Sequence, residues 1–186
     1  MRFNAAYRED VVLDDGSSIE LRLIRHDDKA RLNQVLGGLS VRSRRFRFFV
    51  ARGAYRDWEL RYLSEVDGYD HLAIIAVRGD ESLGVARFVR LQPGGVVAEP
   101  AFAIVDRYQG RGLGRILVGR LAAAAYERGI SHFDVNVLAD NHAMLRLLAG
   151  LGASIPPPAP TDDNLVFRLD LAASFRPWTI RMPRFA

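Results

Sequence analysis

The segment Gln109-Gly110-Arg111-Gly112-Leu113-Gly114-Arg115 decides the fold of this chain, and it stands between an expected strand and an expected amphipathic helix. Glycines in such a turn let the backbone approach a ligand closely and direct several N–H groups toward it. The helix N-terminus adds partial positive charge, while Arg111 and Arg115 add full charges. The pattern predicts a pyrophosphate site, and the alternative is a tight strand–helix turn with exposed arginines.

Two common nucleotide-binding motifs fail at this turn. The dinucleotide pattern G-x-G-x-x-G needs a glycine where this chain has Arg115 or Leu117, depending on the starting glycine. The P-loop spacing is present from Gly114, but Arg120-Leu121 stand where a lysine and a hydroxyl are required. We therefore reject nucleotide hydrolysis, and the pattern Q/R-x-x-G-x-G/A remains.

The rest of the chain predicts a mixed α/β fold around one largely antiparallel sheet. Hydrophobic periodicity and turn residues indicate a hairpin, three short helices, a three-stranded meander and then a β–α–β–α–β order. The expected strands cover 11–13, 19–23, 71–77, 83–91, 96–105, 133–137 and 164–171, and the expected helices cover 28–36, 40–50, 57–66, 114–129 and 140–152.

Three local predictions concern the boundaries of these elements. His26-Asp27-Asp28 offers caps for the first helix. Ser40 starts the second helix, which should carry Phe46 together with Phe49-Val50 on one face. Pro100 should interrupt the third strand of the meander, because proline cannot complete a ladder hydrogen bond.

Length and composition exclude several classes of protein. A chain of 186 residues suggests one domain over 1–186, and the absence of Cys excludes a disulfide scaffold and a thiol nucleophile. The four His have no metal-like spacing, so no metal site is expected. No apolar run approaches the roughly 18 residues of a membrane helix, and the N-terminus lacks a signal-peptide layout. We therefore expect a cytoplasmic protein without a membrane partner.

Positive charge is concentrated in one stretch. Seven arginines lie between Arg42 and Arg61 against Asp57 and Glu59, a local net charge of +5 in a chain whose total is +4. Such a stretch is usually a solvated helix face, although it can also meet a phosphate, a nucleic acid or an acidic partner. Nucleic acid is disfavoured because no recognisable helix-turn-helix or RNA-binding motif accompanies the patch.

The glycine turn resembles the acyl-CoA pyrophosphate signature of the GNAT superfamily of N-acetyltransferases. The element order from Ser17 to about Leu171 is similar to the GNAT fold, which implies a core of about 17–171 and a C-terminal tail of 172–186. The segments 40–49 and 98–102 are similar to the GNAT domain of bacterial protein lysine acetyltransferases. The tail could cover a neighbouring subunit, as in a homodimer, or dock on its own domain.

The resemblance also implies roles for residues outside the turn. Ile104 and Val105 fall where the family's splayed strand offers main-chain groups to the pantetheine arm and an N–H to the thioester oxygen. Asn141 stands where an asparagine commonly contacts pantetheine, although it could equally cap a helix. Many GNAT enzymes place a tyrosine seven residues later as general acid, and this chain has Leu148 there.

A base is needed because a lysine-like amine, with a pKa near 10.4, is protonated at neutral pH. Glu99 matches the catalytic glutamate of the protein acetyltransferases, and the small Ala101 and Ala103 on its face leave room for a substrate. The alternative is an exposed strand glutamate.

The expected reaction is acetyl transfer from acetyl-CoA to a protein lysine or a small amine by direct attack in a ternary complex. A non-catalytic acyl-CoA sensor is the alternative.

Overall fold

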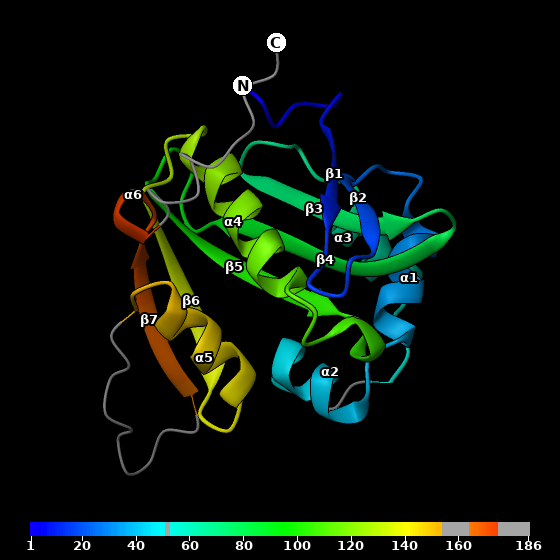
Figure 1. Cartoon of the computed structure of the whole chain (residues 1–186). Coiled ribbons are helices and arrows are strands. Elements are labelled where there is room, and N and C mark those ends of the chain that lie inside the picture. Colours follow the sequence, from blue (N-terminus) through cyan, green and yellow to red (C-terminus); the bar gives the residue numbers. More distant parts are fainter. Residues whose placement is uncertain (51–52, 154–163, 175–186) are drawn as a thin grey trace.

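The computed structural model describes residues 1–50, 53–153 and 164–174. One seven-stranded sheet organises them, in the order β1-β2-β3-β4-β5-β6-β7 (Figure 1). The strands are β1 (Arg8–Val12), β2 (Ser18–Leu23), β3 (His71–Arg78), β4 (Glu81–Arg90), β5 (Val97–Ile104), β6 (His132–Leu138) and β7 (Asn164–Asp170). The helices are α1 (Lys29–Gly37), α2 (Val41–Phe48), α3 (Asp57–Ser64), α4 (Leu113–Tyr126), α5 (His142–Gly150) and α6 (Leu171–Ser174), with a 3-10 turn at Asp106–Tyr108.

Hairpin connections explain why the sheet is mostly antiparallel. The first turn is closed by a hydrogen bond from Leu13 N to Ser17 O, and Gly16 adopts a φ of 82° there. Gly79 turns the chain from β3 to β4 with a φ of 57°. Every neighbouring pair of strands is antiparallel except β5 and β6, which are parallel and joined through α4. A parallel pair needs such a crossover connection.

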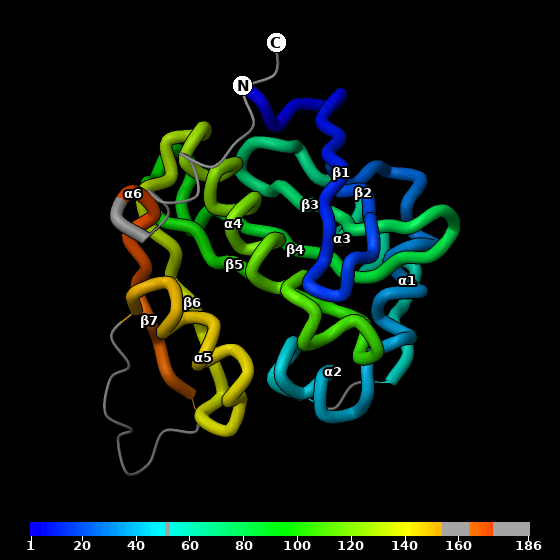
Figure 2. Tube along the Cα trace, in the orientation of Figure 1, coloured from blue at the N-terminus to red at the C-terminus, as the bar shows by residue number. Residues whose placement is uncertain are grey.

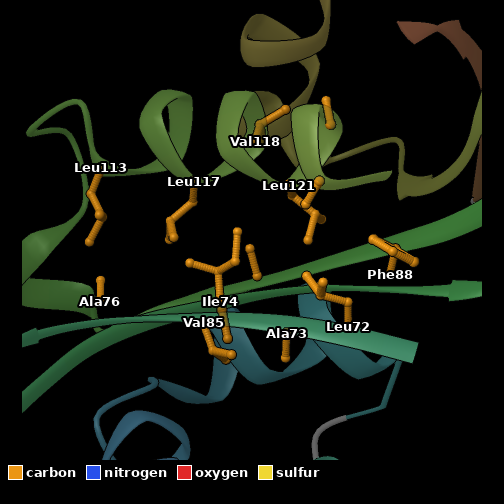
Figure 3. Close-up of a cluster of buried hydrophobic side chains, with 14 of the residues drawn as sticks. Leu72, Ala73, Ile74, Ala76, Val85, Phe88, Leu113, Leu117, Val118 and Leu121 are labelled. Carbon is orange, nitrogen blue, oxygen red and sulfur yellow. The ribbon is translucent and has the colours of Figure 1, made fainter. Parts of the chain in front are cut away.

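The core lies on both faces of this sheet. Figure 3 shows the α4 side chains of Leu117 and Leu121 directed toward Ile74 and its neighbours, and all three residues are fully buried. Val85 lies on the opposite face of the sheet, the side that α1 covers. Because helices cover both faces, the central strand β3 is apolar over nearly its whole length instead of alternating.

Strands β5 and β6 pair over only two positions in the described part of the chain. Val97 lies opposite His132, and Ala98 lies opposite Phe133, at the start of both strands. The rest of β5 continues to pair with β4, up to Gly84 opposite Ile104. The two parallel strands therefore diverge and leave a splay between them, which is visible in Figure 1.

Pro100 does not interrupt β5, contrary to the prediction. The strand runs unbroken from Val97 to Ile104, with Pro100 opposite Phe88 of β4. Val97 O accepts a hydrogen bond from Leu91 N, and Val105 N donates one to Leu83 O, so the backbone groups of odd-numbered residues of β5 face the β4 side. The missing N–H of Pro100 therefore faces β6, and pairing with β6 ends immediately before it.

Two other local predictions need correction. Asp28 occupies the N-cap position of α1 without capping it, because its buried carboxylate binds both Nη atoms of Arg22 at 2.6 Å. Helix α2 starts after Ser40 as expected, and the Ser40 side chain accepts a bond from Ser43 N. The helix ends at Phe48, however, because Phe49 adopts a left-handed φ of 61°, so Phe49 and Val50 are exposed.

Candidate active site

The glycine turn leads from β5 into α4 and presents an uncapped helix N-terminus. Gly110 and Gly112 adopt φ values of 73° and 83°, a conformation that side chains other than glycine rarely adopt. The first helical hydrogen bond runs from Ile116 N to Gly112 O, and no side chain of the described residues caps the helix. The N–H groups of the three residues 113–115 thus have no partner within the helix. This arrangement suits an anion such as a phosphate.

The remaining glycine of the turn borders the splay. A Cβ added to Gly114 would lie 3.4 Å from Cδ1 of Ile104 on β5 and 3.9 Å from Cδ2 of Leu147 on α5. A methyl group at this position would therefore contact both β5 and α5 at ordinary van der Waals distance. The neighbouring Leu113 side chain is buried beneath α4 (Figure 3), so Leu113 can reach a ligand only through its backbone.

The polar side chains of the turn already have partners. Arg111 pairs with Asp15 at 2.8 Å, and Arg115 pairs with Asp14 at 3.2 Å. Both carboxylates come from the turn between β1 and β2. Gln109 Nε2 donates to Ile104 O at 2.9 Å and also contacts Ser43 Oγ of α2 at 3.2 Å.

The backbone hydrogen bonds next to the turn distinguish the roles predicted for Ile104 and Val105. Val105 N donates to Leu83 O at 2.9 Å, so this N–H is engaged with β4 and cannot serve a thioester oxygen. Ile104, one residue earlier, has its backbone N–H and C=O directed to the side of the splay by strand alternation. Of the two residues, only Ile104 fits the predicted oxyanion contact.

Asn141 caps helix α5, which is one of its two predicted roles. Its Oδ1 accepts from Met144 N at 3.2 Å, and the residue is largely buried. The adjacent Asp140 pairs with Arg45 of α2 at 2.6 Å across the open end of the splay. The hydrogen bond from Arg45 lowers the pKa of Asp140, with the positive charge of Arg42 adding to the effect. Leu148 is 2% exposed and belongs to the core.

Glu99 lies on the face of β5 that is turned toward α1 and α3. The register places it opposite Val89, and it places Ala101 opposite Arg87. Residues directly opposite in an antiparallel pair share a face, so Arg87 is a diagonal neighbour of Glu99. The Glu99 side chain is exposed, while Ala101 and Ala103 beside it are small.

Two arginines near Glu99 have unusual environments. Arg87 is 4% exposed, and its partners among the described residues are neutral acceptors, Leu63 O at 3.0 Å and His71 Nε2 at 3.1 Å. Burial and the positive charge of Arg47 lower the pKa of Arg87 to about 9. Burial also lowers the pKa of Arg47 to about 10, against the opposing effects of Tyr55 and Glu99. Neither guanidinium forms an ion pair within the described ranges.

His71 supports Arg87 rather than acting as a free base. An arginine can only donate, so His71 Nε2 is the acceptor of their hydrogen bond. Burial, together with the charge of Arg87, lowers the pKa of His71 to about 4. The ring is therefore neutral at pH 7, and it packs on Tyr62 with ring centroids 5.2 Å apart.

Sequence reasoning found the glycine turn but missed its acidic partners and the arginine pair. Asp14 and Asp15 are about a hundred positions away in the chain, so no local pattern connects them to the turn. A local signal did exist for Arg87, because it occupies an inward-facing position between Val85 and Val89. A charge at such a position usually has a structural or functional reason.

The described residues contain neither a metal-binding cluster nor a membrane-spanning helix. Their side chains form no group of three or more His, Cys, Asp or Glu that could hold a metal ion. Their helices include none that is long and apolar enough to span a membrane.

A sheet that opens between two parallel strands, with a glycine turn and an uncapped helix after the first strand, is the architecture of the GNAT class of acyltransferases. The chain matches the acetyltransferase (GNAT) family over residues 39–153. That match covers more than half of its length, so the chain belongs to this family. The predicted fold class and family resemblance are thereby confirmed, and members of this family use acetyl-CoA.

Individual relatives agree with this assignment. The chain is 42% identical over 96 residues to acetyltransferase Pat of Mycolicibacterium smegmatis, covering 50% of this chain and 29% of that protein. It is 30% identical over 144 residues to acetyltransferase PA5475 of Pseudomonas aeruginosa, covering 75% of this chain and 77% of that protein. The crystal structure of the GNAT domain of S. lividans PAT is similar with a TM-score of 0.82 and 30% identity, covering 90% of this chain and 99% of that chain. The matched segment thus covers less than a third of the length of Pat.

Proposed function

We propose that this protein transfers an acetyl group from acetyl-CoA to a primary amine, by direct attack in a ternary complex. The observation that carries the proposal is the turn at 109–115, where two left-handed glycines and an uncapped helix N-terminus adjoin the open edge of β5. We further propose that 1–186 is a single domain with its core at about 17–171. Acetyl-CoA supplies an acetyl group activated as a thioester.

The geometry of the glycine turn supports one binding path for acetyl-CoA. The N–H groups of Gly112, Leu113, Gly114 and Arg115 hold the pyrophosphate, with Arg111 and Arg115 as charged partners. Gly114 lets the pantetheine arm pass between β5 and α5. Ile104 binds this arm through its backbone, and its N–H donates to the thioester oxygen as negative charge develops there. Asn141 has a side-chain amide that can donate to pantetheine while its oxygen caps α5.

Glu99 acts as the general base. It accepts a proton from the acceptor ammonium, directly or through one water, and the neutral amine then attacks the thioester carbonyl. The carbon–sulfur bond breaks, the CoA thiolate leaves, and the nitrogen releases its second proton to solvent as the neutral amide forms. No tyrosine protonates the thiolate at position 148, where Leu148 is part of the core, so solvent supplies that proton.

The acceptor is a protein lysine or a small amine. The positive charges near Glu99 support a narrower choice among such amines. Arg47 and Arg87 lie close to the base, and neither forms an ion pair with a carboxylate in the described part of the chain. Positive charge there repels a polycation such as a polyamine. It favours a lysine within an acidic segment or an amine that carries an anionic group.

A non-catalytic acyl-CoA sensor remains the alternative function. The buried Leu148 favours it, because the residue that serves as general acid in many relatives is replaced by a core leucine. Both proteins would bind acetyl-CoA, but the sensor would release no thiol with any acceptor.

Calorimetric titration with acetyl-CoA, followed by a thiol-release assay against amines and lysine peptides, tests the proposal. We expect saturable binding and thiol release with at least one acceptor, with acidic lysine peptides ahead of polyamines. Binding without release across the panel would support the sensor. No binding would show that the glycine turn is only a turn, and the proposal would be wrong.

A further inference from the structure

The turn between β1 and β2 lies directly on the glycine turn. Asp14 N donates to Arg111 O at 3.0 Å, a backbone bond between segments far apart in the chain. Figure 2 shows the two loops side by side at the start of α4. The N-terminal hairpin is therefore part of the wall of the proposed pyrophosphate site.

The hairpin brings two carboxylates into contact with this site. Asp15 forms an ion pair with Arg111, and Asp14 forms one with Arg115. These are the two arginines proposed above to bind the pyrophosphate. The carboxylate of Asp14 also lies over Gly112, since a Cβ at this glycine would be 2.6 Å from Asp14 Oδ2 and 2.8 Å from Oδ1. Close approach to that glycine is what a phosphate bound by the turn requires.

We propose that Asp14 and Asp15 act as a built-in competitor of the CoA pyrophosphate, so that cofactor binding must displace their carboxylates from Arg111, Arg115 and Gly112. This inference rests on the proposed function. The two carboxylates together carry the −2 charge of a pyrophosphate diester. They neutralise Arg111 and Arg115 when no cofactor is bound, and they lower the apparent affinity for CoA.

The contacts are weak enough to be exchanged. The side chains of Asp14 and Arg115 are 58% and 52% exposed, and those of Asp15 and Arg111 are 36% and 41% exposed. Exposed ion pairs contribute little to stability and exchange with other ions. Asp15 also accepts from Ser17 N and Ser17 Oγ, and these bonds hold the turn together when the arginine leaves.

The test is calorimetric titration of acetyl-CoA into the wild type and the double variant Asp14→Asn, Asp15→Asn. The matched control is the double variant Asp10→Asn, Glu20→Gln, which removes the same charge from the same hairpin at positions that face each other across β1 and β2. The single variant Asp14→Asn keeps the Asp15–Ser17 bonds. It therefore tests the competition in a turn that retains its hydrogen bonds, even if the double variant distorts the turn. Thermal unfolding verifies that each variant is folded.

We expect the Asp14, Asp15 double variant to bind acetyl-CoA about tenfold more tightly, because two exposed ion pairs no longer compete. The single variant should show part of this gain, and the control should bind like the wild type. Equal tightening in the control would indicate a general field effect and overturn the inference. Unchanged or weaker binding in the Asp14 variants would also overturn it, because the carboxylates would then position the turn. Failure of the wild type itself to bind would overturn the proposed function as well.

Discussion

Individual residues at the site supply the chemical groups that the proposed reaction needs, and Glu99 is the clearest case. It is an exposed carboxylate beside small residues and near two arginines. We predict that Glu99→Gln lowers kcat by about 10²- to 10⁴-fold, since the amide cannot accept the proton. Acetyl-CoA affinity should be unchanged, as measured by calorimetry. Glu65→Gln, at another exposed glutamate, is the control, and equal rates in both variants would remove Glu99 as the base.

Gly112 has a role that depends on its backbone conformation. We predict that Gly112→Leu abolishes acetyl-CoA binding, because the side chain would enter the space that Asp14 now occupies. The matched control is Gly129→Leu, since Gly129 has a similar φ of 74° with nothing within 4 Å of its Cβ position. Both variants should lose about 1–2 kcal/mol of unfolding free energy through left-handed strain. Retained affinity in Gly112→Leu would refute the pyrophosphate assignment.

Asn141, at the start of α5, has two proposed roles, which are to cap the helix and to bind pantetheine. Two substitutions can tell these roles apart. We predict that Asn141→Asp keeps the stability of the protein, because aspartate is an equally good N-cap. It should bind acetyl-CoA about three- to tenfold more weakly, because the amide donor is lost. Asn141→Ala should lose about 1 kcal/mol of stability as well. If the Asp variant binds acetyl-CoA like the wild type, Asn141 is a cap and nothing more.

The elements themselves were largely predictable because their signals are local. Asp14-Asp15-Gly16 and Gly79 mark tight turns, and the change from helical to strand periodicity after α3 marks the start of the meander. The glycine turn was predictable for the same reason. Phe49 was placed wrongly because a left-handed residue that ends α2 leaves no signature in hydrophobic periodicity.

Contacts between distant segments account for what the sequence could not reveal. Asp28 has the residue type of a helix cap, but the fold brings Arg22 of β2 against it. The pairing of Arg87 with His71 depends on the register of β3 and β4, and the contact of Asp15 with Arg111 depends on how the first hairpin docks. None of these arrangements follows from spacing along the chain.

At the scale of the whole molecule, Arg128 joins three parts of the structure. It is buried just after the end of α4 and donates to Phe3 O, Gly68 O and Ala124 O at 2.6, 2.6 and 2.8 Å. We predict that Arg128→Met costs about 3 kcal/mol of unfolding free energy in urea denaturation, because buried carbonyls lose their donors. Arg168→Met removes an exposed pair with Asp134 and should cost less than about 1 kcal/mol. Similar losses in both variants would contradict a special role for Arg128.

The dependence of stability on pH should report the buried contact between His71 and Arg87. The folded state lowers the pKa of His71 from 6.5 to about 4, so between these values the unfolded chain binds the extra proton and stability falls as pH decreases. This predicts a loss of about 2 kcal/mol between pH 7 and pH 5 in urea denaturation. Folding also lowers the pKa of carboxylates such as Glu9 and Asp28. These groups change the free energy of unfolding mainly below the ordinary carboxyl range, so the change between pH 7 and pH 5 comes from histidine. His71→Gln retains an oxygen acceptor for Arg87 but no titrating group, so its stability should be nearly flat over the same interval. If that variant loses stability as steeply as the wild type, the proton responsible binds elsewhere.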